Sequence, residues 1–240
     1  MDIPLHSNVP QSLIKIPEKK LLYVLDDIKN QCKECKTGAW CASCNNLTHA
    51  LQRYWAANIP VDYWLRDMEA HFYGNPRLKK IYEQVIGDLS KAYNEGIKLC
   101  LAGTHGVGKT MACCCMLKRA VEEGFSGLYL TLSEIVSTLS TAPNEHKTDT
   151  NRAILMVDFL LIDEFDPRYV GSANAADLYG RMLEPTLRHR VQNKLPLFLC
   201  TNSPNVLNTF SGALKTSLSS LMNMVKIIPI TGEDFRGKEK

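Results

Sequence analysis

The chain has 240 residues, of which 45% are hydrophobic and 22% are charged, and its formal net charge is +3 at pH 7. These values are ordinary for a soluble globular protein and allow one sizeable core with a small appendage. The chain has neither an apolar run of roughly 20 residues nor the basic and apolar regions of a signal peptide, so we expect no membrane partner and a cytoplasmic location, or the host cytoplasm if the gene is viral. In that compartment the nine cysteines are expected to be reduced or bound to metal.

The first part of the chain is predicted to be helical. After an arm with three prolines at 1–17, apolar spacing indicates helices over 18–30 and 46–57, on either side of a cysteine-rich segment at 32–44. A connector with Pro60 and the run PVDYWLRDM follows. Asn75 and Pro76 then have the pattern of a helix N-cap and a first helical residue, and this helix is predicted to extend to residue 94.

From residue 97 onward the pattern alternates between strands and helices. Short apolar runs predict five strands, namely IKLCLAG, GLYLTL, FLLIDEFD, PLFLCTN and VKIIPIT. The segments between them predict helices over 109–124, 133–140, 149–157, 172–190 and 209–223, with a polar loop at 141–149 and a kink at Pro185. Such an alternation predicts an α/β fold with a parallel five-stranded sheet between helices.

A glycine-rich loop, GTHGVGKT, lies between the first predicted strand and the helix after it. Gly103, Gly108, Lys109 and Thr110 match the pattern G-x-x-x-x-G-K-[ST] in its required strand–loop–helix context. Glycines let the backbone N–H groups point at phosphate oxygens, Lys109 would reach the β- and γ-phosphates, and the Thr110 hydroxyl would bind Mg²⁺. The residues expected to bind the nucleotide are Gly103, Thr104, His105, Gly106, Val107, Gly108, Lys109, Thr110 and Met111. The alternative is a glycine-rich turn with a chance lysine.

Polar side chains at the ends of two later strands favour hydrolysis of ATP. Asp163 ends an apolar strand and would hold Mg²⁺, while Glu164 could accept a proton from the attacking water. Asn202, at the tip of the next strand, could orient that water. Two solvated acids and a turn-forming Asn before Ser203-Pro204 are the alternative interpretation. The segment QNKL has an Asn-Lys pair but lacks the aspartate that would recognise guanine.

These motifs resemble those of the AAA+ ATPases, and among them the DnaC/DnaI-type helicase loaders and the IstB-like transposition ATPases. GTHGVGKT resembles Walker A, FLLIDEF resembles Walker B, and LPLFLCTN resembles the sensor 1 strand, while NIPVDYW is similar to the segment that walls the adenine pocket. The resemblance covers about residues 58–231 and implies a P-loop AAA+ fold without a C-terminal helical lid. It implies an N-terminal helical, zinc-binding docking domain over 1–57, a connector over 58–75 and an ATPase domain over 76–240.

One departure from the family concerns the arginine that acts on the nucleotide of a neighbouring subunit. Loaders place it in the helix after sensor 1, where this chain has GALKTSLSSLMN and only Lys215 as a cation. Arg188 and Arg190 could act in trans instead, or they could be solvated charges that neutralise the end of a helix. Without such an arginine, which contributes about 10³ or more in rate, self-stimulated turnover should be weak.

Cys32, Cys35, Cys41 and Cys44 form a C-x₂-C-x₅-C-x₂-C pattern. Two C-x₂-C pairs can present four thiolates to one tetrahedral ion, so zinc in a structural role is the first expectation, ahead of an iron–sulfur cluster or plain reduced thiols. Cys113, Cys114 and Cys115 are consecutive on a helix and cannot face one ion together. They are expected to be small packing residues, at least one of them buried behind the glycine loop.

The family resemblance also implies self-association into a ring or spiral that binds single-stranded DNA. The basic groups that could contact DNA include Lys118-Arg119, Arg77 with Lys79-Lys80, and Arg188-His189-Arg190, although each could equally be a solvated helix face. The stretch 141–150 and the loop DPRYVGSANA, with Arg168 and Tyr169, could line a channel.

The function expected from the sequence is an ATP-driven switch that loads a replicative hexameric helicase during the initiation of DNA replication. The alternatives are an IstB-like ATPase partner of a transposase on duplex DNA, and an ATP-binding adaptor that hydrolyses too slowly to matter.

Overall fold

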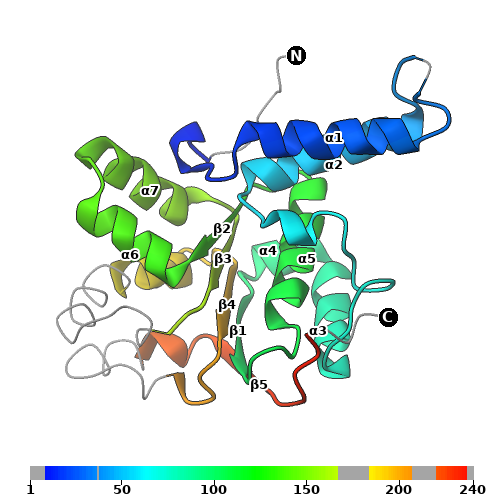
Figure 1. The fold of residues 1–240 in the computed structure, drawn as a ribbon. Helices are drawn as coiled ribbons and strands as arrows, with labels where there is room; N and C mark the ends of the chain where they lie inside the picture. The colour runs from blue at the N-terminus through cyan, green and yellow to red at the C-terminus, as the bar shows by residue number, and fades with distance from the viewer. Residues whose placement is uncertain (1–8, 37, 167–183, 207–219, 237–240) are drawn as a thin grey trace.

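In the computed structural model, which describes residues 9–36, 38–166, 184–206 and 220–236, five parallel strands form one sheet. The strands are β1 (Lys98–Gly103), β2 (Gly127–Thr131), β3 (Phe159–Asp163), β4 (Leu197–Thr201) and β5 (Lys226–Ile230). Their order across the sheet is β2-β3-β4-β1-β5 (Figure 1). The prediction of a five-stranded parallel α/β sheet is therefore confirmed.

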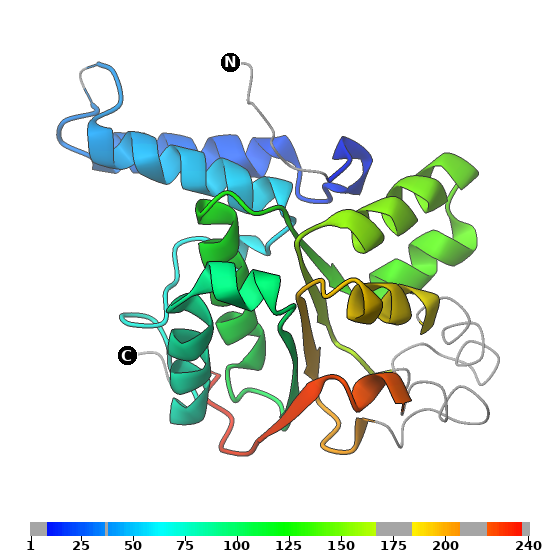
Figure 2. The same ribbon diagram turned by 180° about the vertical axis from the view of Figure 1, so that it is seen from behind.

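Helices cover both faces of the sheet because alternate strand residues are apolar on both sides. On one face lie α2 (Ala42–Ala56), α3 (Pro76–Ile86), α4 (Leu89–Asn94) and α5 (Lys109–Glu122), and on the other α6 (Leu132–Thr141), α7 (Asn144–Met156) and the helical residues 184–192 (Figures 1 and 2). In β1, Leu99 and Leu101 pack toward α5, whereas Cys100 and Ala102 pack toward the α6–α7 side. Strands buried on both faces explain the near-continuous apolar runs in the sequence.

The N-terminal helices form a hairpin that extends from the body formed by the sheet and its helices. Helix α1 (Glu18–Gln31) lies alongside α2, and the cysteine-rich loop is at the far end of the pair (Figure 1). The other end of α2 is attached to α5, since Arg53 donates to the carbonyls of Val121 and Glu122, at 3.1 and 2.5 Å. The domain division at 57 and 75 stays a prediction.

Four local predictions differ from the structure. Helix α2 begins at Ala42, because the Cys41 Sγ accepts from the N–H of Cys44, so the second cysteine pair lies on its first turn. The single helix predicted from 76 to 94 is divided at Gly87, where Asp88 caps α4. The helix predicted over 133–140 begins at Leu132, because Thr131 caps it and forms a capping box with Glu134. Most of the predicted loop at 141–149 is the start of α7.

The remaining sequence-based predictions follow the structure where it can be described. Residues 184–192 and 220–222 are helical, while 172–183 and 209–219 of the two predicted helices lie outside the described residues. Within the described ranges, no helix has the length and hydropathy needed to cross a membrane.

Candidate nucleotide-binding site

The glycine-rich loop leaves β1 at the carboxyl edge of the sheet and returns into α5. Gly106 has φ 73° and Gly108 has φ 93°, which are left-handed backbone conformations that favour glycine. At Gly108 this conformation starts α5, so the helix begins at Lys109 with its free N–H groups and positive dipole end beside the loop. This arrangement suits an anion, and most of all a chain of phosphates.

Lys109 is buried, and its ammonium group lies inside the loop. Its Nζ donates to the carbonyls of Gly103 (3.1 Å) and Thr104 (2.6 Å) and to the Oδ1 of Asn202 (3.0 Å). Burial lowers the pKa of Lys109 below the ordinary 10.5 because desolvation disfavours the charged form. The hydrogen bond to Asn202 joins the glycine loop to the tip of β4.

Asp163 has a buried carboxylate that accepts three hydrogen bonds. Its Oδ1 accepts from the Thr110 hydroxyl (3.3 Å) and from the N–H of Glu164 (2.8 Å), and its Oδ2 accepts from the Tyr129 hydroxyl (3.0 Å). Desolvation nevertheless raises the pKa of Asp163 above 3.8. A hydroxyl and a carboxylate oxygen side by side are hard oxygen ligands, which fits Mg²⁺.

Glu164 and Asn202 complete the polar wall of the site. The Glu164 side chain is exposed and its backbone has φ 50°, a conformation that turns the chain sharply at the end of β3. Strand β4 lies between β3 and β1, so Asn202 at its tip stands between the acid pair and the glycine loop. Lys109, Thr110, Asp163, Glu164 and Asn202 all line one cavity of about 280 Å³.

The opposite wall of this cavity comes from the connector and from the end of the described chain. Tyr63, Arg66 and Tyr73 of the connector line it, together with Phe235 and Arg236. The segment at 231–236 is attached to the glycine loop, since the N–H of Phe235 donates to the carbonyl of Gly106 at 3.0 Å. Aromatic and basic side chains therefore line the same cavity as Lys109, Thr110 and Asp163.

The four N-terminal cysteines are close enough to share one ion. All four Sγ atoms lie within 4.8 Å of one another, and those of Cys32 and Cys41 are 3.9 Å apart. A tetrahedral zinc site with Zn–S bonds near 2.3 Å requires S–S separations of about 3.8 Å. The N–H of Cys35 lowers the pKa of the Cys32 thiol to about 7, which favours the thiolate that a metal needs. The geometry therefore fits a small structural zinc site.

Comparison with known proteins identifies the family. The family model described as IstB-like ATP binding protein matches residues 65–240. The chain belongs to this IstB-like family. None of the curated proteins matches the sequence.

Solved structures show the same fold. DnaI is 20% identical with a TM-score of 0.57, and the match covers 74% of this chain and 94% of DnaI. The DnaC helicase loader is 18% identical with a TM-score of 0.57, covering 71% and 99%. A putative primosome component from Streptococcus pyogenes serotype M3 is 16% identical with a TM-score of 0.56, covering 74% and 91%. The predicted relation to the DnaC, DnaI and IstB-like AAA+ proteins is confirmed.

The two arginines that were candidates for action in trans lie in different environments. Arg188 is exposed and pairs with Glu184. Arg190 is fully buried, and its guanidinium donates to the carbonyls of Ile154, Val157, Asp158 and Pro196 at 2.7–2.9 Å. This burial conflicts with a trans-acting role for Arg190, whose side chain instead joins the end of α7 to the start of β4.

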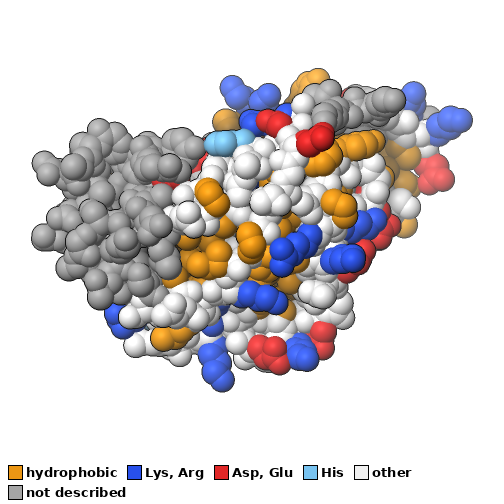
Figure 3. Space-filling model, turned by 90° about the horizontal axis from the view of Figure 1, so that it is seen from below, with side chains coloured by type: hydrophobic (Ala, Val, Ile, Leu, Met, Phe, Trp, Pro, Cys, Tyr) orange, Lys and Arg blue, Asp and Glu red, His pale blue; other side chains and the backbone are white. Residues whose placement is uncertain are grey.

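The structure also locates other cysteine and basic residues that the sequence analysis singled out in this IstB-like chain. Cys113, Cys114 and Cys115 are all buried on α5, as expected of packing residues. Lys118 is buried too, so it is neither a solvated helix face nor a DNA contact. On the face seen in Figure 3, Lys and Arg side chains of the described residues are scattered among hydrophobic ones instead of forming one patch. Arg168 and Tyr169 lie outside the described residues.

Three residues of the IstB-like site escaped the sequence motifs. Tyr129 is one residue in an apolar strand, and nothing in its spacing indicates a hydrogen bond to Asp163. Phe235 and Arg236 lie more than 120 residues beyond the loop they face. The aromatic and basic character of EDFR was the only available signal.

Proposed function

We propose that this protein hydrolyses ATP and uses the nucleotide to control its assembly on single-stranded DNA, where it delivers a replicative hexameric helicase. The observation that carries the proposal is the convergence of Lys109, Thr110, Asp163, Glu164 and Asn202 on one cavity. Phosphate-binding, metal-binding and proton-accepting groups in one place are what hydrolysis of a phosphoanhydride requires.

Each residue has a role that follows from its position. Lys109 would leave its carbonyl partners and bind the β- and γ-phosphates, while the loop N–H groups hold the other phosphate oxygens. Thr110 and Asp163 would hold Mg²⁺, which neutralises phosphate charge when bound. Asn202 would orient a water molecule in line with the γ-phosphate. Glu164 would take a proton from that water as its oxygen bonds to phosphorus and ADP departs.

The role in helicase loading rests on fold relatives and on the N-terminal hairpin. One solved relative is named as a helicase loader, and a DnaA structure with a TM-score of 0.53 is described as bound to single-stranded DNA. The cysteine-bearing tip of the hairpin extends away from the sheet and is accessible to a partner. In this proposal Cys32, Cys35, Cys41 and Cys44 hold zinc, and the hairpin binds the helicase. Arg188, which is exposed, stays a candidate for action in trans.

The IstB-like family model favours a second candidate, an ATPase partner of a transposase that acts on duplex DNA. The two candidates differ in the DNA that they bind and in the protein that they recruit. They share the ATP site, so turnover alone does not distinguish them.

The test uses Glu164→Gln, which should retain ATP with little hydrolysis. Fluorescence anisotropy would measure its binding to labelled single-stranded and duplex DNA, and light scattering its assembly state, each with ATP and with ADP. We expect ATP-dependent assembly and tighter binding to the single strand. Mass spectrometry of proteins captured from host lysate should identify a hexameric helicase, lost when Cys32 and Cys35 are changed to Ser. Preference for duplex and capture of a transposase would establish the second candidate instead.

A further inference from the structure

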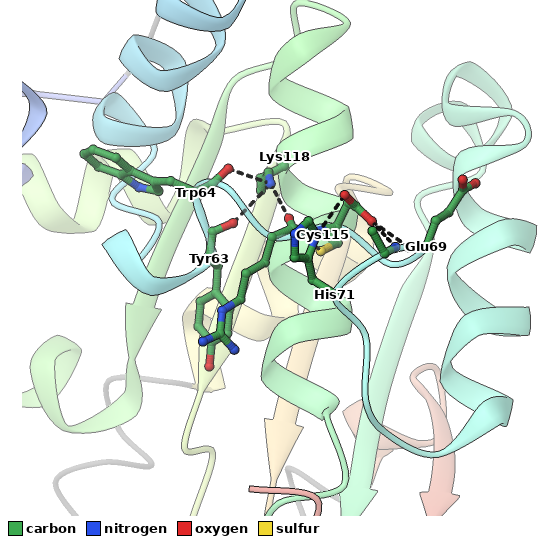
Figure 4. A network of polar contacts seen from close by, with 9 residues as sticks. Tyr63, Trp64, Glu69, His71, Cys115 and Lys118 are labelled. Atoms are coloured by element: carbon green, nitrogen blue, oxygen red, sulfur yellow. Dashed lines mark hydrogen bonds and ion pairs between the residues drawn. The ribbon is translucent and has the colours of Figure 1, made fainter. Parts of the chain in front are cut away.

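Lys118 is a buried lysine whose position the ATP site does not explain. It lies on α5 with 7% of its surface exposed, and no carboxylate of the described residues forms an ion pair with it. Its Nζ donates to the carbonyls of Tyr63 (3.1 Å), Trp64 (2.9 Å) and Arg66 (2.6 Å), and lies 4.9 Å from the ring centre of Tyr54 (Figure 4). Desolvation lowers the pKa of Lys118.

These contacts stabilise both the buried ammonium group of Lys118 and the connector backbone that it touches. Burying an ammonium ion is costly unless hydrogen bonds replace its lost hydration. The three carbonyls lie at the end of the short helical turn η2 (Val61–Tyr63) and just beyond it, where the last carbonyl groups of a turn are not all used by its own N–H groups. The Tyr63 carbonyl also accepts from the N–H of Arg66 at 3.3 Å. A cation at the end of a helical turn is favourable, so Lys118 and the connector stabilise each other.

The same stretch of connector presents side chains to the nucleotide cavity. Tyr63 and Arg66 line that cavity, although their carbonyls face Lys118 on the other side. In Figure 4 the Tyr63 ring extends away from Lys118. Trp64, between them, is buried and donates to the carbonyl of Ile59 at 2.7 Å. The backbone of this stretch is therefore fixed at several points, while the side chains of Tyr63 and Arg66 line the nucleotide cavity.

A second set of hydrogen bonds continues the connector beyond Arg66. The Asp67 carboxylate accepts from the N–H groups of Glu69 (2.8 Å) and Ala70 (2.6 Å), and its Oδ2 is 3.0 Å from the His71 Nδ1. The Ala70 N–H is the main reason that the pKa of Asp67 is lowered. His71 lines the nucleotide cavity as well.

We propose that Lys118 is a positioning residue for nucleotide recognition, which holds the connector so that Tyr63 and Arg66 face the base and ribose of the bound nucleotide. Helix α5 then fixes both halves of the ligand, because Lys109 at its start binds phosphates and Lys118 lies nine residues later, about 13 Å along the axis. The inference rests on the proposed ATP binding and adds how the non-phosphate part of ATP is recognised.

The experiment compares ATP with inorganic tripolyphosphate, which can use the glycine loop but has no base. Lys118→Met removes the three donors and keeps an apolar stem, and exposed Lys80→Met is the matched control. Calorimetry should show that Lys118→Met weakens ATP binding about 10-fold, which corresponds to about 1.4 kcal/mol, while tripolyphosphate binding changes less than about 2-fold. Lys80→Met should bind both as the wild type does.

Two results would overturn this role. Unchanged ATP affinity in a folded Lys118→Met protein would mean that the lysine serves only the fold. An equal loss for both ligands would mean that the glycine loop itself is disturbed. If circular dichroism shows that Lys118→Met does not fold, Lys118→Gln is compared in the same way, with the same criteria.

A double variant tests whether the effect passes through the connector. In a Tyr63→Ala background, Lys118→Met should weaken ATP binding by less than about 3-fold, because the side chain that it positions is already gone. A full 10-fold effect in that background would contradict the proposal. Failure of the wild type to bind ATP, with tripolyphosphate still bound, would instead reject the proposed ATPase function.

Discussion

Asp163 combines a costly position with a proposed role in holding Mg²⁺. It is 7% exposed, accepts three hydrogen bonds and still has a raised pKa, because desolvation outweighs its donors. In the protein without metal, the buried negative charge has no cation partner as close as Mg²⁺ would be. Active sites often retain such unfavourable groups at the expense of stability.

The cost of burying the Asp163 charge predicts how the stability of the protein depends on pH. Between 3.8 and the raised pKa of Asp163, the folded state binds more protons than the unfolded state, so the free energy of unfolding decreases as pH rises through this window. Above the raised pKa of Asp163 the penalty is fully present. Asp163→Asn should therefore raise the Tm of the metal-free protein by roughly 2–4 °C, for about 1 kcal/mol, and should abolish stabilisation by Mg²⁺ and ATP.

Thermal unfolding by calorimetry, with EDTA and then with Mg²⁺ and ATP, checks both effects. Asp62→Asn, at an exposed position of the connector, is the control and should leave both quantities unchanged. A lower Tm for Asp163→Asn in EDTA would show that its hydrogen bonds outweigh its desolvation.

Single residues were predictable where a local pattern determines their neighbours. Lys109 and Thr110 follow from the spacing of the loop, and Asp163 follows from a strand that ends in acids. Tyr129 and Lys118 were not predictable as site residues, because their partners are 34 and about 52–55 residues away and depend on packing. Arg190 was wrongly expected to be accessible, because its neighbours in the sequence face the solvent whereas its own side chain is buried in the fold.

At the scale of elements, the α1–α2 hairpin depends on its cysteine loop. The loop joins two helices, the first of which leaves Leu22 and Tyr23 57% and 73% exposed. Four thiolates within 4.8 Å would repel one another without a cation. In the thiol form, a side-chain hydrogen bond with Cys41 is the main reason that the pKa of Cys44 is raised. A metal would remove this repulsion and close the hairpin.

Zinc should therefore be present in stoichiometric amount and should stabilise the hairpin. We expect about one zinc per chain by plasma emission spectrometry, and loss of most of it in Cys35→Ser, because three thiolates form an incomplete site. Hydrogen exchange should become faster in α1 and in the first turns of α2, with little change in the sheet. Ser43→Ala, at an exposed position between the ligands, is the control. A red-brown protein that contains iron would instead show that the four cysteines hold an iron–sulfur cluster and not zinc.

Helix and strand types were more predictable than their ends. Apolar runs locate all five strands. Strands β1 to β4 need such runs because they are buried on both faces. Strand β5, at the edge of the sheet, is exposed at Lys226, Ile227 and Pro229. The start of α2 was missed because a cysteine acts as its N-cap, and the break before α4 because Gly87 was included in a helix that Asp88 restarts. Capping depends on which side chain reaches a particular N–H, and the sequence offers several candidates for each.

At the scale of the whole molecule, strand order explains why the site forms where it does. After β1 the chain forms β2 at one edge of the sheet. Strands β3 and β4 then lie between β2 and β1. Ligands bind at such a switch point outside the carboxyl ends of parallel strands. The insertion of β4 between β1 and β3 brings Asn202 to Lys109, although they are 93 residues apart.

The measurement that tests the central claim most directly is steady-state phosphate release with Mg²⁺ and ATP, with and without single-stranded DNA, for the wild type, Glu164→Gln and Lys109→Ala. The account predicts turnover by the wild type, a loss of about 100-fold or more in kcat for Glu164→Gln with ATP still bound, and no bound ATP for Lys109→Ala. Phosphate release by the wild type that never exceeds that of Lys109→Ala would contradict it and leave an ATP-binding adaptor.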